Sequence, residues 1–220
     1  MLATRLIAIR HGETAWNAAA RIQGHRDIPL SGLGQRQAQR LAEALRHESL
    51  DALYSSDLAR ARQTAEPLAR ERGLTLRIDR GLRERGFGEF EGLTFAEVEA
   101  RWPESHRRWR QRDPDFGPPG GEGLDAFYRR CVEAAERLCA AHPGESIAIV
   151  AHGGVLDCLY RAATRLDLQA ARTWLLGNAS INRLLHSAEG FSLVGWADAG
   201  HLEGIAADEI EADPSGSARA

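Results

Sequence analysis

The sequence contains no lysine, so all 28 of its basic residues are arginine, in a chain of 220 residues with a net charge of −3. A protein without lysine cannot form a Schiff base through that side chain, and it cannot build a phosphate-binding loop of the GxxxxGK[ST] type. Any anion must therefore be bound by arginine, histidine or backbone N–H groups. Nucleic acids and anionic membranes favour a surplus of positive charge, which is lacking here, and we expect neither as a partner.

Cysteine and long apolar runs are also scarce. The cysteines are Cys131, Cys139 and Cys158; they form no CxxC pair, and their odd number favours a reduced chain over a disulfide framework. Cys139 and His142 are one helical turn apart, but two ligands are too few for a zinc site, and we expect no metal and no other cofactor. The longest apolar run near the start, 6–9, is too short for a signal peptide or a membrane span. These absences predict a soluble, cytoplasmic protein.

Apolar, β-branched runs alternate with helical patterns along the chain, which predicts an α/β domain with a largely parallel sheet. Strands are expected at 6–9, 53–55, 74–78 and 146–154, with a terminal hairpin of 180–187 and 191–197. Helices are expected at 31–46, 124–142 and 155–166. A further helix is expected to begin with Ser56 as its N-cap and to end at Gly73.

A polar, aromatic segment rich in proline and glycine interrupts this pattern. We expect residues 86–123 to form an insertion over one face of the sheet, as a lid. Within it, Thr94 and Glu97 match a capping box for a short helix that ends before Pro103. Trp102, Trp109 and Phe116 are expected to pack inside the insertion, the alternative being that they line an apolar part of a substrate pocket. Residues 1–205 then form a single domain, and the acidic, polar residues 206–220 a disordered tail.

Two of the predicted strands end in the same way. The stretches IAIRHG and IAIVAHGG each stop at a histidine followed by glycine. In an open α/β sheet the carboxyl ends of the strands share one edge, where ligands bind. The stretches YSSDLARARQTA and LRERGFGEFEG follow two further strands and bring an arginine and a glutamate to that edge. We therefore expect five side chains to lie close together at the carboxyl edge of the sheet, namely Arg10, His11, Arg60, Glu84 and His152.

This combination of side chains suits phosphoryl transfer. Guanidinium groups match the oxygens of a phosphate, and a neutral imidazole can be the nucleophile that forms a phosphohistidine. Arg10 and Arg60 should disfavour the imidazolium form and lower the pKa of His11. A carboxylic acid can protonate the leaving oxygen. Spacing alone does not choose Glu84 over Glu89 or Glu91 for this role.

Two other features of the sequence point away from chemistry. Arg62 is expected to belong to a general anion-attracting rim rather than to act on the substrate directly. Cys131 and Arg137 have the CxxxxxR spacing of cysteine phosphatases, which need a loop of backbone N–H groups around the phosphate. Here the segment is helical, and its acidic residues would repel an anion, so that chemistry is excluded.

The stretch RHGETAWN (10–17) resembles the signature of the histidine phosphatase superfamily, in its phosphoglycerate-mutase-like branch. SSDLARARQTA, LRERGFGEFEG and VAHGG resemble the other motifs of that family, in the family's order. The resemblance extends over about 6–185. It implies a three-layer α/β/α sandwich around a mostly parallel, six-stranded sheet with one antiparallel strand. It also implies activity without a metal or a nucleotide.

The resemblance also implies residue roles. His11 would accept the phosphoryl group, and Glu84 would donate the proton. Arg10, Arg60 and His152 would form the phosphate pocket. Further phosphate contacts would come from Asn17, Gln23, Gly24 and the backbone N–H of Gly153.

We expect a metal-independent phosphatase that acts on a small phosphorylated metabolite. The true mutases resemble this chain at the same motifs, but they carry a longer insertion between the acid and the second histidine and usually show Thr-Gly where Gly24 follows Gln23. Gly123 stands where many phosphatases of the family carry serine, which leaves the substrate class open. The alternatives are a bisphosphoglycerate-dependent phosphoglycerate mutase and an inactive phosphate-binding regulatory module. The oligomeric state, including a homodimer, is left open.

Overall fold

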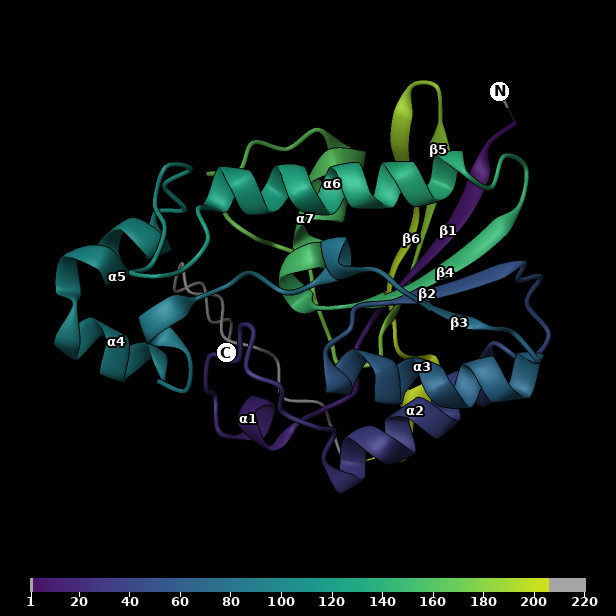
Figure 1. The fold of residues 1–220 in the computed structure, drawn as a ribbon, viewed down its shortest axis with the longest axis horizontal. Coiled ribbons are helices and arrows are strands. Elements are labelled where there is room, and N and C mark those ends of the chain that lie inside the picture. The colour runs from purple at the N-terminus through teal and green to yellow at the C-terminus, as the bar shows by residue number, and fades with distance from the viewer. Residues whose placement is uncertain (1, 206–220) are drawn as a thin grey trace.

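The computed structural model describes residues 2–205, and the predicted disordered tail, 206–220, lies outside them. The described residues contain one six-stranded sheet with the order β3-β2-β4-β1-β5-β6 (Figure 1). Its strands are β1 (Thr4–Arg10), β2 (Ala52–Ser55), β3 (Leu76–Ile78), β4 (Ser146–Ala151), β5 (Ile181–Ser187) and β6 (Gly190–Asp198). β1, β2, β3 and β4 pair in parallel, whereas β5 pairs antiparallel with both β1 and β6. The predicted single antiparallel strand is therefore confirmed for this part of the chain, and it is β5.

Helices cover both faces of the sheet, in the three layers that were predicted (Figure 1). The α-helices are α1 (Ala15–Ala18), α2 (Gly32–Ala44), α3 (Ala59–Arg72), α4 (Phe95–Arg101), α5 (Pro103–Arg110), α6 (Leu124–Ala140) and α7 (Gly153–Thr164), and the short 3-10 helices are η1 (Arg80–Leu82), η2 (Gly88–Phe90) and η3 (Gly200–Leu202). In the described part of the chain, none of these helices has both the length and the apolar character needed to cross a bilayer.

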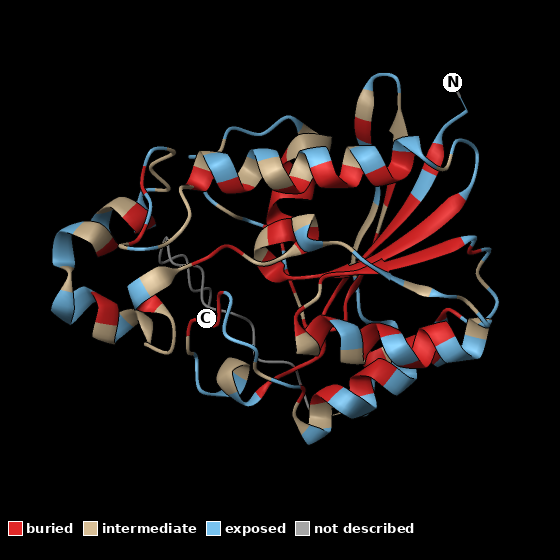
Figure 2. Ribbon diagram, viewed as in Figure 1, coloured by how far each residue is buried: buried red, intermediate tan, exposed pale blue. Residues whose placement is uncertain are grey.

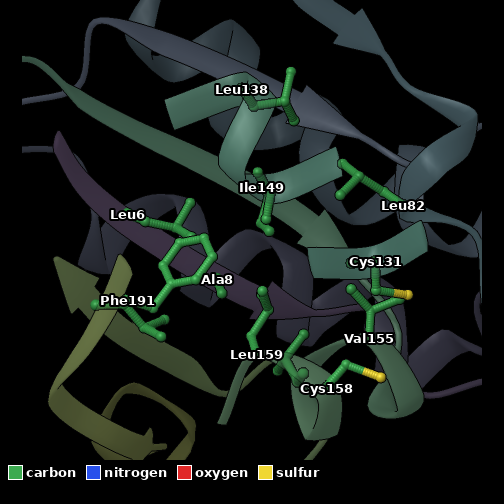
Figure 3. Packing of buried hydrophobic residues seen from close by; sticks show 14 of the residues in the cluster. Leu6, Ala8, Leu82, Cys131, Leu138, Ile149, Val155, Cys158, Leu159 and Phe191 are labelled. Carbon is green, nitrogen blue, oxygen red and sulfur yellow. The ribbon is translucent and has the colours of Figure 1, made fainter. Parts of the chain in front are cut away.

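Alternation along β1 explains the two cores. Ile7 and Ile9 face the layer of α2 and α3, whereas Leu6 and Ala8 face the layer of α6 and α7. Successive side chains of a strand point to opposite faces, so a strand covered on both sides is apolar throughout. Figure 2 shows the buried residues of these helices turned toward the sheet, and Figure 3 shows Leu6 packed in the second core.

The beginning of α3 differs from the prediction. Ser56 is not its N-cap, because the helix begins at Ala59 after Leu58, which makes no side-chain capping bond. The hydroxyl of Ser56 instead accepts a hydrogen bond from the N–H of Leu58 at 3.3 Å. Gly73 does end the helix, in the left-handed conformation with φ of 61°.

The strand predicted at 74–78 is shorter in the structure, where β3 contains only Leu76–Ile78. The N–H of Leu74 donates to the carbonyl of Ala69 at 2.9 Å. That bond belongs to the closing turn of α3. Leu74 is therefore tied to the helix and is not available to pair with β2.

The inserted segment, residues 86–123, contains η2, α4 and α5. The capping box of Thr94 and Glu97 opens α4, as predicted. α5 was not predicted; it begins directly at Pro103, because proline has no N–H to lose at the first position of a helix. The insertion has a small core of its own, with Phe90, Val98, Trp109 and Phe116 packed against Ile22 of the main domain. It thereby stands beside the carboxyl edge of the sheet (Figure 1).

Candidate active site

The two histidines lie side by side where β1 and β4 end. The N–H of His11 donates to the carbonyl of Ala151, the last residue of β4, at 2.9 Å. The ring centroids of His11 and His152 are 5.2 Å apart, with their planes inclined by 58°. The parallel register of the two strands therefore produces the pairing that the repeated sequence pattern predicted.

The imidazole of His11 is oriented by its own main chain. Its Nδ1 lies 2.7 Å from the carbonyl oxygen of Gly12, which can only accept a hydrogen bond, so Nδ1 carries the proton. Nε2 then keeps its lone pair. Burial lowers the pKa of His11 well below 6.5, and the charges of Arg60 and Arg10 lower it further. The predicted direction is confirmed, although burial contributes more than either arginine.

Backbone carbonyls hold both of the predicted arginines. Arg10 is 1% exposed, and its guanidinium donates to the carbonyl of Leu176. Arg60 is fully buried at the start of α3 and donates to the carbonyls of Arg26 at 2.8 Å and Gly24 at 2.9 Å. These bonds are to uncharged carbonyl groups, so the bonds themselves do not neutralise the positive charge of either guanidinium.

Glu84 is the carboxylate that meets His11 at a common cavity. Its Oε1 accepts from the N–H of Arg85 at 2.9 Å, and its Oε2 accepts from the N–H of Gly154 at 3.1 Å. Glu91 is occupied elsewhere, since its Oε1 accepts from the N–H groups of His25 and Phe87. The tertiary structure therefore distinguishes Glu84 from Glu91 as the carboxylate at the cavity, which their spacing in the sequence could not do.

The common cavity has a volume of about 150 Å³. It contains part of the predicted set, namely Arg10, His11, Asn17, Gln23, Gly24, Arg60 and Glu84. Arg62 is exposed and does not line it. The rest of the lining comprises four aromatic residues, Trp16, Phe87, Phe95 and Trp109, together with Ala20, Arg21 and Ile22. Trp109 also packs on Phe90 at a centroid distance of 5.7 Å, so it serves both of the roles considered for it.

Two predicted residues lie behind this cavity rather than on its lining. His152 is fully buried, and within residues 2–205 neither of its ring nitrogens has a hydrogen-bond partner. Burial and the charge of Arg60 lower the pKa of His152 well below 6.5. Gly153 follows as the first residue of α7, so the pair places a neutral imidazole at the amino end of a helix.

Two amide side chains of the predicted set, Asn17 and Gln23, line the same cavity. The Oδ1 of Asn17 lies 3.0 Å from the N–H of Thr14, which donates to it, so the Asn17 amide nitrogen is available to donate. Oε1 of Gln23 has no hydrogen-bond partner in the described part of the chain, although Gln23 is only 8% exposed. A buried acceptor in that state marks a place where a hydrogen-bond donor, such as a hydroxyl group or a water molecule, can bind.

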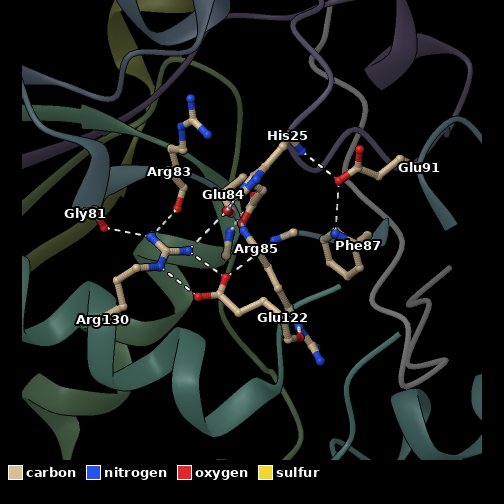
Figure 4. A network of polar contacts seen from close by, with 11 residues as sticks. His25, Gly81, Arg83, Glu84, Arg85, Phe87, Glu91, Glu122 and Arg130 are labelled. Carbon is tan, nitrogen blue, oxygen red and sulfur yellow. Dashed lines mark hydrogen bonds and ion pairs between the residues drawn. The ribbon is translucent and has the colours of Figure 1, made fainter. Parts of the chain in front are cut away.

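The segment that carries Glu84 is tied down by residues that the sequence analysis missed (Figure 4). Arg130 of α6 donates to both carboxylate oxygens of Glu122, at 2.8 and 2.7 Å. The same guanidinium donates to the carbonyls of Gly81, Arg83 and Glu84. Nothing local in the sequence indicates the three carbonyl contacts, because they join residues that are 49, 47 and 46 positions apart.

Two close contacts support the loop after His11. The N–H of Gly12 donates to the hydroxyl of Thr64 at 2.9 Å, and Asn178 donates to the carbonyl of His11 at 3.0 Å. A Cβ on Gly12 would lie 2.7 Å from the carbonyl oxygen of Gly34. Only glycine fits at position 12, because the backbone of α2 passes too close to leave room for a side chain.

No group of three or more histidine, cysteine, aspartate or glutamate side chains within residues 2–205 is arranged to hold a metal ion. The cavity offers guanidinium, imidazole and amide groups, which bind an anion. This donor set fits a phosphate.

Comparisons with known proteins agree with this geometry. Residues 6–199 match the family model described as the histidine phosphatase superfamily, branch 1. Phosphoglycerate mutase-like protein 4 of Arabidopsis thaliana is 40% identical over 202 residues, which cover 90% of this chain and 86% of the relative. The metal-independent phosphoserine phosphatase of the same plant is 36% identical over 205 residues, covering 92% and 84%. The structure of a mycobacterial glucosyl-3-phosphoglycerate phosphatase is 34% identical, covers 90% of this chain and all of the other, and superimposes with a TM-score of 0.79. With its paired histidines at adjacent strand ends, the chain belongs to the histidine phosphatase superfamily.

Proposed function

We propose that the protein is a metal-independent phosphatase that hydrolyses small phosphomonoesters through a phosphohistidine on His11. The observation that carries the proposal is the state of His11. Its Nδ1 is bound to the Gly12 carbonyl, so Nε2 is available at a cavity lined also by Arg10, Arg60 and Glu84. A neutral nucleophile, two cations and a carboxyl group are the parts that phosphoryl transfer from an ester requires.

In the first step Nε2 of His11 forms a bond to phosphorus as the bond to the ester oxygen breaks. Arg10 and Arg60 balance the charge on the phosphoryl oxygens, with further contacts from Asn17, Gln23, Gly24, His152 and the N–H of Gly153. Glu84, protonated at the start, gives its proton to the leaving oxygen. The products of this step are an alcohol and phosphohistidine.

In the second step water replaces the alcohol. The oxygen of the water forms a bond to phosphorus while the Glu84 carboxylate accepts a proton from that water. The bond between phosphorus and Nε2 of His11 breaks at the same time. Inorganic phosphate and neutral His11 are regenerated, with Glu84 again protonated. Aromatic residues of the inserted segment enclose the cavity, and we assign this segment the role of a lid that limits access of bulk water.

Two of the relatives support hydrolysis of small esters, because their names specify phosphoserine and glucosyl-3-phosphoglycerate as substrates. The mutase alternative rests on the names of other relatives, which include the mutase-like protein and a probable phosphoglycerate mutase of Yersinia pestis. We place the protein in the cytoplasm, since its three cysteines are buried and free.

A panel of phosphomonoesters, assayed for free phosphate without added bisphosphoglycerate, tests the proposal. Release of phosphate, together with an acid-labile phosphoprotein in a rapid quench, supports it. Fast conversion of 3- to 2-phosphoglycerate would identify a mutase instead. Binding of the esters without turnover would identify an inactive module.

A further inference from the structure

Glu91 does not line the cavity at His11, yet its carboxylate joins two segments that meet there. Its Oε1 accepts from the backbone N–H of His25 at 2.9 Å and from that of Phe87 at 3.1 Å. Its Oε2 lies 3.6 Å from Nε of Arg26, whose side chain is exposed. The side chain of Glu91 is only 10% exposed, so water competes little for its bonds to the two N–H groups. Hydrogen bonds to a charged acceptor are the strong kind.

The N–H of His25 belongs to a short loop that is held from two sides. Arg60 donates to the carbonyls of Gly24 and Arg26, at 2.9 and 2.8 Å, on either side of that residue. Glu91 holds the N–H from the opposite direction of polarity, as an acceptor. A Cβ on Gly24 would fall on the Glu91 carboxylate, so the loop and the carboxylate are in direct contact. Because Gly24 and Arg60 both line the cavity, the loop that Glu91 holds also positions the Arg60 guanidinium.

The same loop contacts the segment that carries the proposed acid. Nε2 of His25 lies 2.9 Å from the carbonyl oxygen of Glu84, which can only accept, so this nitrogen donates. Phe87, whose N–H is bound by Glu91, lines the cavity together with Glu84. Figure 4 shows Glu91 bonded to both His25 and Phe87. One carboxylate therefore links the loop at the phosphate end of the cavity to the segment at the acid end.

Main-chain bonds next to Glu91 do not depend on its side chain. The N–H of Ile22 donates to the carbonyl of Leu93 at 2.9 Å, and the N–H of Gly92 donates to the carbonyl of Ile22 at 2.8 Å. These bonds keep the two segments paired when the carboxylate is removed. Substitution of Glu91 should therefore affect mainly the loop beyond Ile22, and we expect the variants to fold.

We propose that Glu91 is a positioning residue: by holding the loop of residues 24–26, its carboxylate fixes the Arg60 guanidinium and Glu84 relative to each other at the cavity. Glu91 itself does not touch the substrate. For its effect on catalysis the inference rests on the phosphatase function proposed above. Its effect on phosphate affinity can be measured without turnover.

Binding of inorganic phosphate, measured by isothermal titration calorimetry, tests the phosphate end. Glu91→Ala leaves two N–H groups without their acceptor, and we expect the Kd of phosphate to rise at least about tenfold. Glu91→Asp is one methylene shorter and cannot reach both N–H groups, so its Kd should also rise. Glu91→Gln keeps an oxygen that accepts from both, and its Kd should stay within about threefold of the wild-type value.

Glu89, an exposed residue of the same segment, provides the matched control. Glu89→Ala should leave the Kd of phosphate unchanged. A wild-type Kd in Glu91→Ala and Glu91→Asp, with circular dichroism showing folded proteins, would overturn the inference. If Glu91→Ala does not fold, Glu91→Asp alone decides in the same way. A loss in Glu91→Gln as large as that in the other Glu91 variants would also overturn it, because an acceptor is still present.

Steady-state kinetics distinguish positioning from a purely structural role. A purely structural role would reduce the amount of folded enzyme, which lowers kcat on every ester by one factor and leaves KM unchanged. Positioning predicts a higher KM for p-nitrophenyl phosphate in folded Glu91→Ala. It also predicts a larger loss of kcat on benzyl phosphate than on p-nitrophenyl phosphate, because the poorer leaving group needs a well-placed Glu84. A uniform loss of kcat with wild-type KM would count against the inference.

The outcomes separate the two proposals. A wild-type protein that binds phosphate but hydrolyses no ester contradicts the phosphatase function, whereas the order of Kd among the variants still tests the role of Glu91 in phosphate binding. Normal hydrolysis by the wild type, with the same Kd and KM in Glu91→Ala, contradicts only the Glu91 inference.

Discussion

The carboxylate of Glu84 accepts a hydrogen bond from the backbone N–H of Gly154, with 3.1 Å between the two atoms. This bond ties the proposed proton donor to the first turn of α7, the helix that follows directly after His152. The first turn of α7 therefore positions both the group proposed to bind the phosphate and the group proposed to protonate the leaving oxygen. Small changes in this turn should lower the rate of catalysis.

Gly154→Ala should misplace Glu84. A Cβ at this position would lie 2.2 Å from Oε1 of Glu84 and 3.0 Å from the ring of Phe127. Because small errors in the position of a catalytic group are costly, we expect kcat on an alkyl phosphate to fall by about 100-fold. Gly195→Ala, where a Cβ meets nothing within 4 Å, is the control. A folded Gly154→Ala enzyme with wild-type kcat would show that the contact does not position the acid.

His11→Ala should abolish turnover and the acid-labile phosphoprotein, because no other side chain in the proposed mechanism accepts the phosphoryl group. Treatment of the wild-type enzyme with EDTA should leave the rate unchanged. Phosphate release and phosphoprotein trapping are the measurements. Substantial activity in the variant would reject His11 as the nucleophile.

The acid limb of kcat/KM, which reports the ionisations of the free enzyme, should show protonation of His11 only below pH 6.5. The base form of His11 is the proposed nucleophile, and burial with Arg60 and Arg10 lowers its pKa well below 6.5, so the imidazole stays neutral as the pH falls through that value. NMR titration of the ring, assigned with His11→Ala, measures this directly. A protonation midpoint at or above 6.5 would refute the electrostatic argument.

The same shift affects stability. The unfolded chain takes up a proton on each histidine near pH 6.5, whereas the native state resists protonation at His11 and His152. The free energy of unfolding should therefore decrease as the pH falls below 6.5, by up to about 1.4 kcal/mol per pH unit for each group. Urea titrations between pH 7.5 and 5.5 measure the slope, and it should be smaller in His11→Ala.

Glu84→Gln should slow the hydrolysis of alkyl phosphates far more than that of p-nitrophenyl phosphate. A good leaving group needs little protonation, so loss of the acid matters less for it; we expect losses of about 100-fold or more against about tenfold. Steady-state kcat on the two substrates gives the comparison. Equal losses would argue that another group donates the proton.

Arg130 and its neighbour Arg129 offer a paired test on one helix. Arg130 and Glu122 are 27% and 22% exposed, whereas Arg129 and its partner Asp125 are 65% and 44% exposed. Arg130→Gln loosens the segment that carries Glu84, so kcat should fall about tenfold and stability by about 1–3 kcal/mol. Arg129→Gln should change stability by less than about 1 kcal/mol. Similar effects from both variants in activity and urea titrations would count against the network in Figure 4.

Much of this fold could be predicted because the strong signals are local. The apolar runs of β1 and β4 indicate buried strands, and each ends at a histidine, so adjacency of the two strands suffices to pair His11 with His152. The predictions failed where the local sequence is compatible with more than one backbone conformation. Ser56 had the chemistry of an N-cap, yet α3 begins at Ala59. No helix was predicted for the polar stretch that begins at Pro103, yet it is helical as α5.

The sequence alone determined the chemical types at the site, since the order of its motifs and the absence of lysine left arginine, histidine and carboxyl groups to bind and transform an anion. Tertiary structure decided which carboxylate meets His11, through the Gly154 N–H and the contacts of Arg130. It also placed the carboxylate of Glu91 against the backbone N–H of His25. The reason is physical: hydrogen bonds and charges act over a few ångströms in space, and residues distant in sequence come within that range only when the chain is folded.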